Sequence, residues 1–73
     1  MKFVYPRVRD LREDNDLTQE NIAKKLDLHL TQYRRYETGG SEIPTHIIKE
    51  LARFYNVSSD YLIGLTDNPT VNK

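Results

Sequence analysis

The segment that decides the fold runs from Thr18 to Glu37 and has the sequence TQENIAKKLDLHLTQYRRYE. Its first half carries three apolar residues on one side of a helix, namely Ile22, Ala23 and Leu26. Thr18 precedes this helix as an N-cap, but Asn21 stands where Glu or Gln would complete a capping box. The segment therefore predicts a short helix with an incomplete capping box, followed by a turn and a second helix.

The second helix of this segment is expected over residues 30–37. Tyr33 and Tyr36 lie three residues apart and share its inner face, and Gly39 supplies the left-handed residue that ends a helix. Asp27 lies where the turn before this helix is expected. Two short helices joined by a tight turn are typical of a helix-turn-helix, which places its second helix in the major groove of DNA.

The outer face of this second helix carries hydrogen-bonding and cationic side chains. At about 100° per residue, Thr31 and Arg35 lie opposite the two tyrosines, with Gln32 and Arg34 on the flanks. Arg binds guanine bidentately, Gln binds adenine, and a Thr methyl or a Leu side chain, here Leu30, contacts the thymine methyl. Any solvated helix face can also carry Thr, Gln and Arg, so the helix-turn-helix context is what favours DNA.

Three more helices are expected around this segment. Pro6 suits the first turn of a helix over residues 7–14. Pro44 precedes a helix over residues 45–55, and a short fifth helix is expected over residues 60–64. The apolar side of the helix over 45–55 is expected to comprise Ile47, Ile48, Leu51 and Phe54. With no alternating apolar pattern and no repeat, the 73 residues predict one all-α domain.

Composition argues against several functional classes. The chain has no cysteine, and His29 and His46 are far apart, so a zinc site and any other metal site or cofactor are not expected. No apolar run approaches the ~20 residues that cross a bilayer, and the first residues lack a signal-peptide core. We therefore expect a cytoplasmic protein without a membrane segment. The 73 residues leave no room for a sensor domain, so no small-molecule ligand is expected.

Titratable residues do not form a catalytic constellation. The acidic cluster of Glu13, Asp14 and Asp16 is interpreted as a solvated helix end. No nucleophile–base pair is visible, so we do not expect an enzyme. His29 is either a pH-sensitive group, given its unperturbed pKa of ~6.5, or an exposed cap without a role.

The net charge is zero, but the charges are unevenly distributed. Residues 1–36 hold eight Lys and Arg against six Asp and Glu, a net of +2, whereas residues 37–73 hold three against five, a net of −2. The small basic excess therefore lies in the half that contains the expected DNA-reading helix.

A combination of residues along the chain resembles the Cro and Xre-type phage repressor family. The matching positions are Arg12, Thr18, Gln19, Ala23, Leu28, Glu37, Gly39, Pro44 and the ending NVSSDYLIGLTD at 56–67. The match covers about residues 7–65. It implies a compact five-helix, lambda-repressor-like DNA-binding domain over residues 1–65, followed by a frayed tail over 66–73. It also implies a homodimer that binds double-stranded DNA with its third helix in the major groove.

The resemblance also implies roles for individual residues. Gln19 matches a phosphate-contacting glutamine, at a helix N-terminus that suits an anion. The base-contacting positions are Leu30, Thr31, Gln32 and Arg35. The backbone-contacting positions are Arg34, Gly39, Gly40 and Ser41. Arg12 and Glu37 match a salt bridge between the first and third helices, which we interpret as scaffold and not as a DNA contact.

Three positions depart from the family pattern. Asp27 replaces a frequent Gly at the turn, which Asp tolerates at some cost because it can adopt the left-handed conformation. His29 is a poorer N-cap than Ser or Thr, and Leu30 is apolar where relatives often carry a polar residue. These departures concern the target sequence and not the class of protein.

A dimer interface is expected at the end of the domain. Leu62, Ile63 and Leu65 lie in a segment too short to bury all three, so we expect them, with Tyr61, to form a two-fold interface. The expected function is a transcriptional regulator, in the form of a repressor, on an inverted-repeat operator. The alternative is a protein-interaction module, such as an antitoxin or anti-regulator, which the neutral charge and Leu30 favour.

Overall fold

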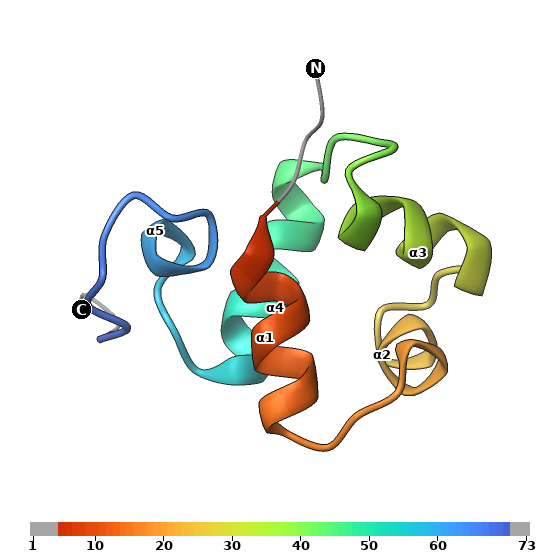
Figure 1. The fold of residues 1–73 in the computed structure, drawn as a ribbon, viewed down its shortest axis with the longest axis horizontal. Helices are drawn as coiled ribbons and strands as arrows, with labels where there is room; N and C mark the ends of the chain where they lie inside the picture. The colour runs from red at the N-terminus through yellow and green to blue at the C-terminus, as the bar shows by residue number, and fades with distance from the viewer. Residues whose placement is uncertain (1–4, 71–73) are drawn as a thin grey trace.

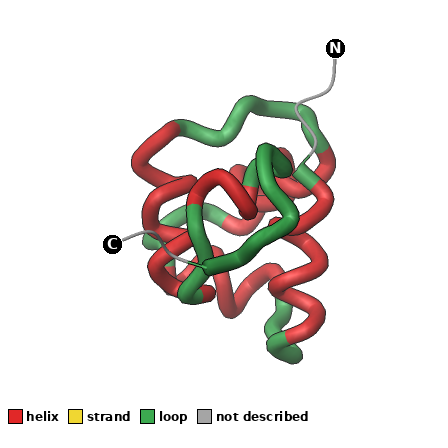
Figure 2. The backbone as a smooth tube through the Cα atoms, turned by 90° about the vertical axis from the view of Figure 1, so that its left-hand side faces the viewer, coloured by secondary structure: helices red, strands yellow, loops and turns green. Residues whose placement is uncertain are grey.

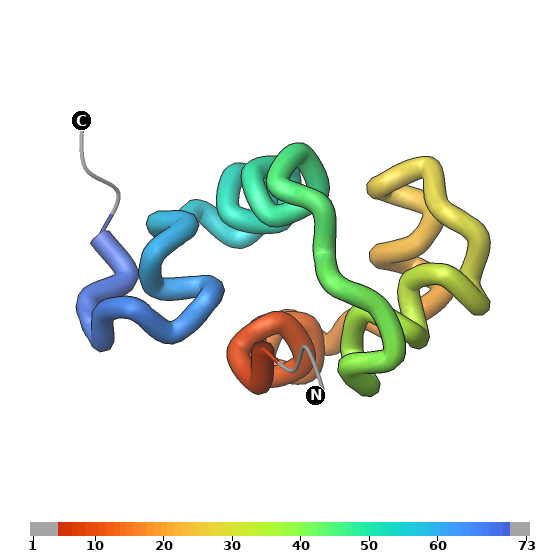
Figure 3. Tube along the Cα trace, turned by 90° about the horizontal axis from the view of Figure 1, so that it is seen from above, coloured from red at the N-terminus to blue at the C-terminus, as the bar shows by residue number. Residues whose placement is uncertain are grey.

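Five helices follow one another along residues 5–70, the part of the chain that this computed structural model describes (Figure 1). They are α1 (Pro6–Asp14), α2 (Gln19–Lys25), α3 (Leu30–Thr38), α4 (Thr45–Tyr55) and α5 (Ser59–Leu62). Seen from above, α1 and α4 lie in the middle, with α5 at one end and the α2–α3 pair at the other (Figure 3). The described residues contain no strand, which confirms the all-α, five-helix prediction.

Local sequence signals explain where the first helices begin. Pro6 occupies the start of α1, where its missing N–H is not needed. The Thr18 hydroxyl accepts a hydrogen bond from the Asn21 N–H at 3.0 Å, and the Asn21 amide oxygen accepts one from the Thr18 N–H at 3.0 Å. The prediction of an incomplete capping box is therefore wrong, because the carbonyl oxygen of Asn accepts the bond that Glu or Gln provides elsewhere.

Left-handed residues end the helices at the expected places. Asp27 adopts φ 55° between α2 and α3, and the following Leu28 N–H donates to the Ala23 carbonyl at 2.8 Å. Gly39 adopts φ 85° after α3, and Asn56 adopts φ 56° after α4. These three residues turn the chain so that successive helices pack against one another.

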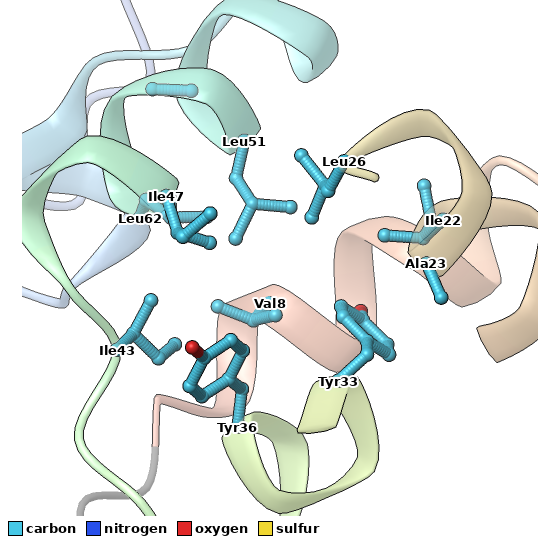
Figure 4. Packing of buried hydrophobic residues seen from close by; sticks show 11 residues of the cluster. Val8, Ile22, Ala23, Leu26, Tyr33, Tyr36, Ile43, Ile47, Leu51 and Leu62 are labelled. Atoms are coloured by element: carbon cyan, nitrogen blue, oxygen red, sulfur yellow. The ribbon is translucent and has the colours of Figure 1, made fainter. Parts of the chain in front are cut away.

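The core lies between α1, α3 and α4 and is closed by α2 and α5 (Figure 4). Its fully buried large side chains are Val8, Ile22, Tyr33, Leu51 and Leu62. Phe54 was expected on the inner side of α4, but it is 43 % exposed. The buried residues of α4 are Ile47, Leu51 and Ala52, with Ile48 and Tyr55 partly buried, so Phe54 lies at the edge of the buried face.

The short last helix begins at a serine cap and is followed by a chain that folds back. The Ser58 hydroxyl accepts a hydrogen bond from the Tyr61 N–H at 3.0 Å, and Gly64 adopts φ 87° after the helix. The loop after α5 then returns across it (Figure 2), and the Ser58 N–H donates to the Pro69 carbonyl at 3.0 Å. Residues 66–70 of the expected tail thus contact the domain, whereas 71–73 lie outside the described residues. The domain boundary at residue 65 stays a prediction.

Candidate nucleic-acid interface

Helix α3 separates a buried side from an exposed side, as its sequence predicts. Tyr33 and Tyr36 are buried in the core, and they hold α3 against the rest of the domain. On the outer side Thr31, Arg34, Arg35 and Thr38 are exposed and Gln32 is partly buried. Leu30, which was expected to contact a base, is partly buried and packs against the core. The face that was expected to touch DNA is therefore free to meet a partner.

An ion pair ties the end of α3 to α1. The Arg12 guanidinium donates to Glu37 through Nε at 2.6 Å and through Nη2 at 3.2 Å, and it also donates from Nη1 to the Leu17 carbonyl at 2.7 Å. The two side chains are only 13 % and 3 % exposed. The expected structural salt bridge between Arg12 and Glu37 is thus present, and it is largely withdrawn from water.

The surroundings of Glu37 keep it ionised. Burial alone would raise the pKa of this carboxyl, but the hydrogen bond from Arg12, the nearby Tyr33 hydroxyl and the hydrogen bond from Gln19 together outweigh burial, and the pKa of Glu37 lies below its usual value. The hydrogen bond to Glu37 in turn raises the pKa of Arg12. A negative charge therefore lies between α1, the start of α2 and the end of α3, and the positive charge of Arg12 pairs with it.

Gln19 links this ion pair to the surface of α3. Its Nε2 donates to Glu37 Oε1 at 3.1 Å, and its Oε1 accepts a hydrogen bond from Arg34 Nε at 3.2 Å. Gln19 is the first residue of α2, so the bond to Arg34 brings the start of α2 and the outer face of α3 together. Sequence reasoning placed Gln19, Arg34 and Glu37 separately and did not anticipate this chain of bonds.

Two tyrosine hydroxyls are buried near the same carboxylate. The Tyr33 and Tyr55 hydroxyl groups have no hydrogen-bond partner among the described residues. Burial raises the pKa of Tyr33, and the nearby Glu37 carboxylate adds to the increase. Burial likewise raises the pKa of Tyr55 to about 12, again with a contribution from Glu37. No sequence signal distinguishes these hydroxyls from those of ordinary core tyrosines.

The loop after α3 closes on its own helix. The backbone N–H groups of Gly39, Gly40 and Ser41 point at the Arg35 carbonyl, with distances of 3.0, 2.9 and 3.4 Å. Gly40 is exposed beside Arg35 and Thr38, and Ser41 is partly buried. Because the loop N–H groups already have an acceptor, the Ser41 hydroxyl is the group most suited to the backbone contact predicted for this loop.

The expected dimer residues lie at the far end of the molecule, around α5 (Figure 3). Leu65 is 74 % exposed, and Tyr61 and Ile63 are partly buried. Leu62 needs a correction, because it is only 1 % exposed and belongs to the core of the single chain. The short segment buries one of its three aliphatic residues inward and leaves the other two at or near the surface.

The remaining candidates of the sequence lie on the surface. His46 is exposed on α4, and His29 is exposed before α3, where its side chain forms no cap hydrogen bond. Glu13, Asp14 and Asp16 are likewise exposed at the end of α1. Within residues 5–70, no helix has the length and apolar character needed to cross a membrane.

Comparison with known proteins agrees with this geometry. The family model described as Helix-turn-helix matches residues 8–62. A similar protein is the uncharacterized HTH-type transcriptional regulator YobD of Bacillus subtilis, 41% identical over 63 residues, which are 86% of this chain and 56% of that protein. The cryptic phage CTXphi transcriptional repressor RstR of Vibrio cholerae is 35% identical over 80% of this chain and 52% of its own length.

A third relative belongs to another functional class. The antitoxin PezA of Streptococcus pneumoniae is 32% identical over 78% of this chain and 36% of its own length. No solved structure gives a significant match. The chain belongs to the helix-turn-helix family, in its Cro and Xre-like branch. It spans roughly a third to just over half of the length of these curated relatives.

Proposed function

We propose that this chain is a sequence-specific double-stranded-DNA-binding domain of a transcriptional regulator, and that it acts as a repressor in the cytoplasm. The observation that carries the proposal is the division of α3, in which two buried tyrosines anchor one side while Thr31, Arg34 and Arg35 project from the other. An exposed helix with cationic and hydrogen-bonding side chains fits the major groove and its pattern of donors and acceptors. The names of the relatives YobD and RstR support a regulatory role.

In this proposal the residues that read bases are Leu30, Thr31, Gln32 and Arg35. The residues that contact the sugar–phosphate backbone are Gln19, Arg34 and Ser41. Two copies are needed because one domain of this size covers about one half-site. A dimer built on the exposed residues after α5 sets the two α3 helices about one DNA turn, ~34 Å, apart, and the operator is then an inverted repeat. No catalytic step is part of the proposal.

The test is a selection of bound sites from random duplexes, followed by binding of Arg35→Ala to the selected site. Loss of a bidentate base contact is expected to weaken specific binding by roughly 1–3 kcal/mol and to relax preference at one base pair. A uniform loss on every duplex would reassign Arg35 to the phosphate backbone. If wild type enriches no sequence at all, the chain does not read DNA by itself.

A second candidate function is a protein-interaction module. Two observations favour it, namely the similarity to the antitoxin PezA and the zero net charge of the chain. Phe54 is exposed on α4, outside both α3 and the expected dimer residues, so its substitution leaves the surfaces of the first proposal intact. Phe54→Ser is expected to leave DNA selection unchanged under the first proposal and to abolish partner binding under the second.

A further inference from the structure

A continuous chain of hydrogen bonds leads from the buried ion pair to the exposed face of α3. Arg12 holds the Glu37 carboxylate, Glu37 Oε1 holds the Gln19 amide nitrogen at 3.1 Å, and the Gln19 amide oxygen holds Arg34 Nε at 3.2 Å. The first two members are largely buried and the last is exposed. A scaffold role for Arg12 and Glu37 explains the bond between these two residues. It does not explain the bonds that Gln19 forms with Glu37 and Arg34.

The ionised carboxylate decides which way the Gln19 amide faces. A carboxylate accepts hydrogen bonds and cannot donate them, so the Gln19 side chain must turn its NH₂ group toward Glu37. Its carbonyl oxygen then faces Arg34, which only donates. The neutral amide of a glutamine at position 37 can both donate and accept hydrogen bonds, so it would allow the Gln19 amide either orientation.

The bond to Gln19 also determines which part of Arg34 remains free. It occupies Arg34 Nε, and the two Nη groups form no hydrogen bond with the residues that the structure describes. The Nη groups are a pair of donors suited to bidentate binding of a phosphate. Holding this long side chain before DNA arrives removes an ordering cost that otherwise opposes binding.

We propose that Glu37 is a positioning residue for the DNA backbone contact, because it orients Gln19 and, through Gln19, presents the Arg34 guanidinium to a phosphate. This inference rests on the proposed DNA-binding function. It assigns the buried ion pair a role in recognition in addition to its role in holding α1 and α3 together.

Glu37→Gln tests the inference because charge and positioning predict opposite results. Removal of a negative charge beside the interface strengthens binding to a polyanion if only long-range electrostatics act. Loss of positioning weakens binding instead, by roughly 3- to 10-fold when one long side chain must be ordered. It also lowers the slope of log affinity against log salt by about 1, because Arg34 no longer neutralises a phosphate.

Glu42→Gln is the matched control. Glu42 is exposed in the loop that follows α3 and lies outside the chain of hydrogen bonds, and its substitution removes the same charge. We expect its affinity for the selected duplex to equal or exceed that of wild type, with an unchanged salt slope. Weaker binding of Glu37→Gln together with unchanged or tighter binding of Glu42→Gln supports positioning.

A second variant separates positioning from stability, since Glu37→Gln leaves Arg12 without its charged partner. Gln19→Met keeps a side chain of similar length, removes both hydrogen-bonding groups and leaves the ion pair intact. Gln19 carries no charge, so its own loss does not change the salt slope. We nevertheless expect the slope to fall by about 1, because Arg34 is released. If Glu37→Gln does not fold, judged by circular dichroism, Gln19→Met decides alone.

The outcomes distinguish this inference from the proposed function. If wild type selects no duplex, the proposed function fails and the inference fails with it. If wild type binds its selected duplex and the folded variants keep its salt slope, the DNA-binding function stands and the positioning role is wrong, because a loss of affinity alone in Gln19→Met reflects the contact that Gln19 itself makes.

Discussion

The guanidinium of Arg7 lies over the ring of Tyr61, 4.0 Å from its centroid, and its Nη1 donates to the Tyr61 carbonyl at 2.7 Å. The same side chain donates to the Thr66 carbonyl and pairs with Asp67 through Nη2 at 2.6 Å. One residue of α1 therefore fixes both α5 and the chain that follows it. Arg suits this position because its planar group can stack on an aromatic ring and donate several bonds at once.

Arg7→Ala is expected to lower the free energy of unfolding by about 2 kcal/mol, from the lost cation–π contact and charged hydrogen bonds, discounted for partial exposure. Urea denaturation measures the loss. Arg9→Ala is the control on the same helix, since among residues 5–70 Arg9 forms only an exposed pair with Glu13, and it should cost less than ~1 kcal/mol. Equal effects of the two substitutions would show that the contacts around Tyr61 contribute nothing.

The Arg12–Glu37 ion pair should show strong coupling. Arg12→Met or Glu37→Leu alone is expected to cost roughly 3–5 kcal/mol, because each leaves a buried charge without its partner. The double variant should cost less than either single one, since no charge is then stranded. A double-mutant cycle in urea measures the coupling, and strictly additive losses would mean that water solvates both groups in the native state.

Tyr55→Phe should hardly change stability at neutral pH. The Tyr55 hydroxyl is buried without a hydrogen-bond partner among the described residues, so no bond is lost on its removal. We expect the change in unfolding free energy at pH 7 to stay within ~0.5 kcal/mol. A loss above 1.4 kcal/mol, a tenfold change in equilibrium, would reveal a bond to the hydroxyl.

Tyr55→Phe should lose less stability than wild type at alkaline pH. The pKa of Tyr55 rises to about 12 in the folded chain, against ~10 when unfolded. The Tyr55 hydroxyl therefore keeps its proton to a higher pH in the folded state than in the unfolded state. Its contribution to the free energy of unfolding is complete below pH ~10 and is lost as pH rises toward 12. Wild type should lose about 1 kcal/mol more than Tyr55→Phe over that interval, after discounting for partial exposure. Parallel curves would contradict the raised pKa.

Leu65 and Leu62 should respond differently to a charge. Leu65 is exposed, so Leu65→Asp should leave the helical circular dichroism intact but weaken self-association and binding to an inverted repeat. Leu62 is in the core, so Leu62→Asp should abolish the helical signal by burying a charge. Analytical ultracentrifugation measures association. An unchanged oligomeric state in folded Leu65→Asp would exclude Leu65 from any dimer interface.

Short-range patterns of the sequence predict most of the fold. The positions of Asp27 and Gly39 predict where α2 and α3 end, because few residues adopt a left-handed conformation easily. The spacing of Tyr33 and Tyr36 predicts which side of α3 is buried, since helical geometry alone places them on one face. The capping box was not predicted because Asn is less common than Glu or Gln at position N3, the last residue of that motif.

Positions at the edge of an apolar face were harder to predict. Phe54 and Leu62 are both large apolar residues beside other apolar residues, yet the structure exposes the first and buries the second. Helical periodicity gives the angular position of a side chain but not the direction from which the neighbouring helix arrives. The contacts of α5 with α1 and α4 bury Leu62, and both of these helices lie outside its immediate neighbourhood in the sequence.

By itself, the sequence determined the class of fold, the approximate boundaries of α1 to α4, the outer face of α3 and the pairing of Arg12 with Glu37. These features depend on backbone propensities, helical spacing and a family pattern, all of which are local or already known. The last helix was expected over residues 60–64, but α5 covers Ser59–Leu62. Only the tertiary structure decided that Gln19 connects Glu37 to Arg34 and that the Arg7 guanidinium stacks on the Tyr61 ring. Both contacts join residues that are 15 to 54 positions apart in the sequence, so they depend on how the helices are placed relative to one another. A donor–acceptor distance of about 3 Å is needed for a hydrogen bond.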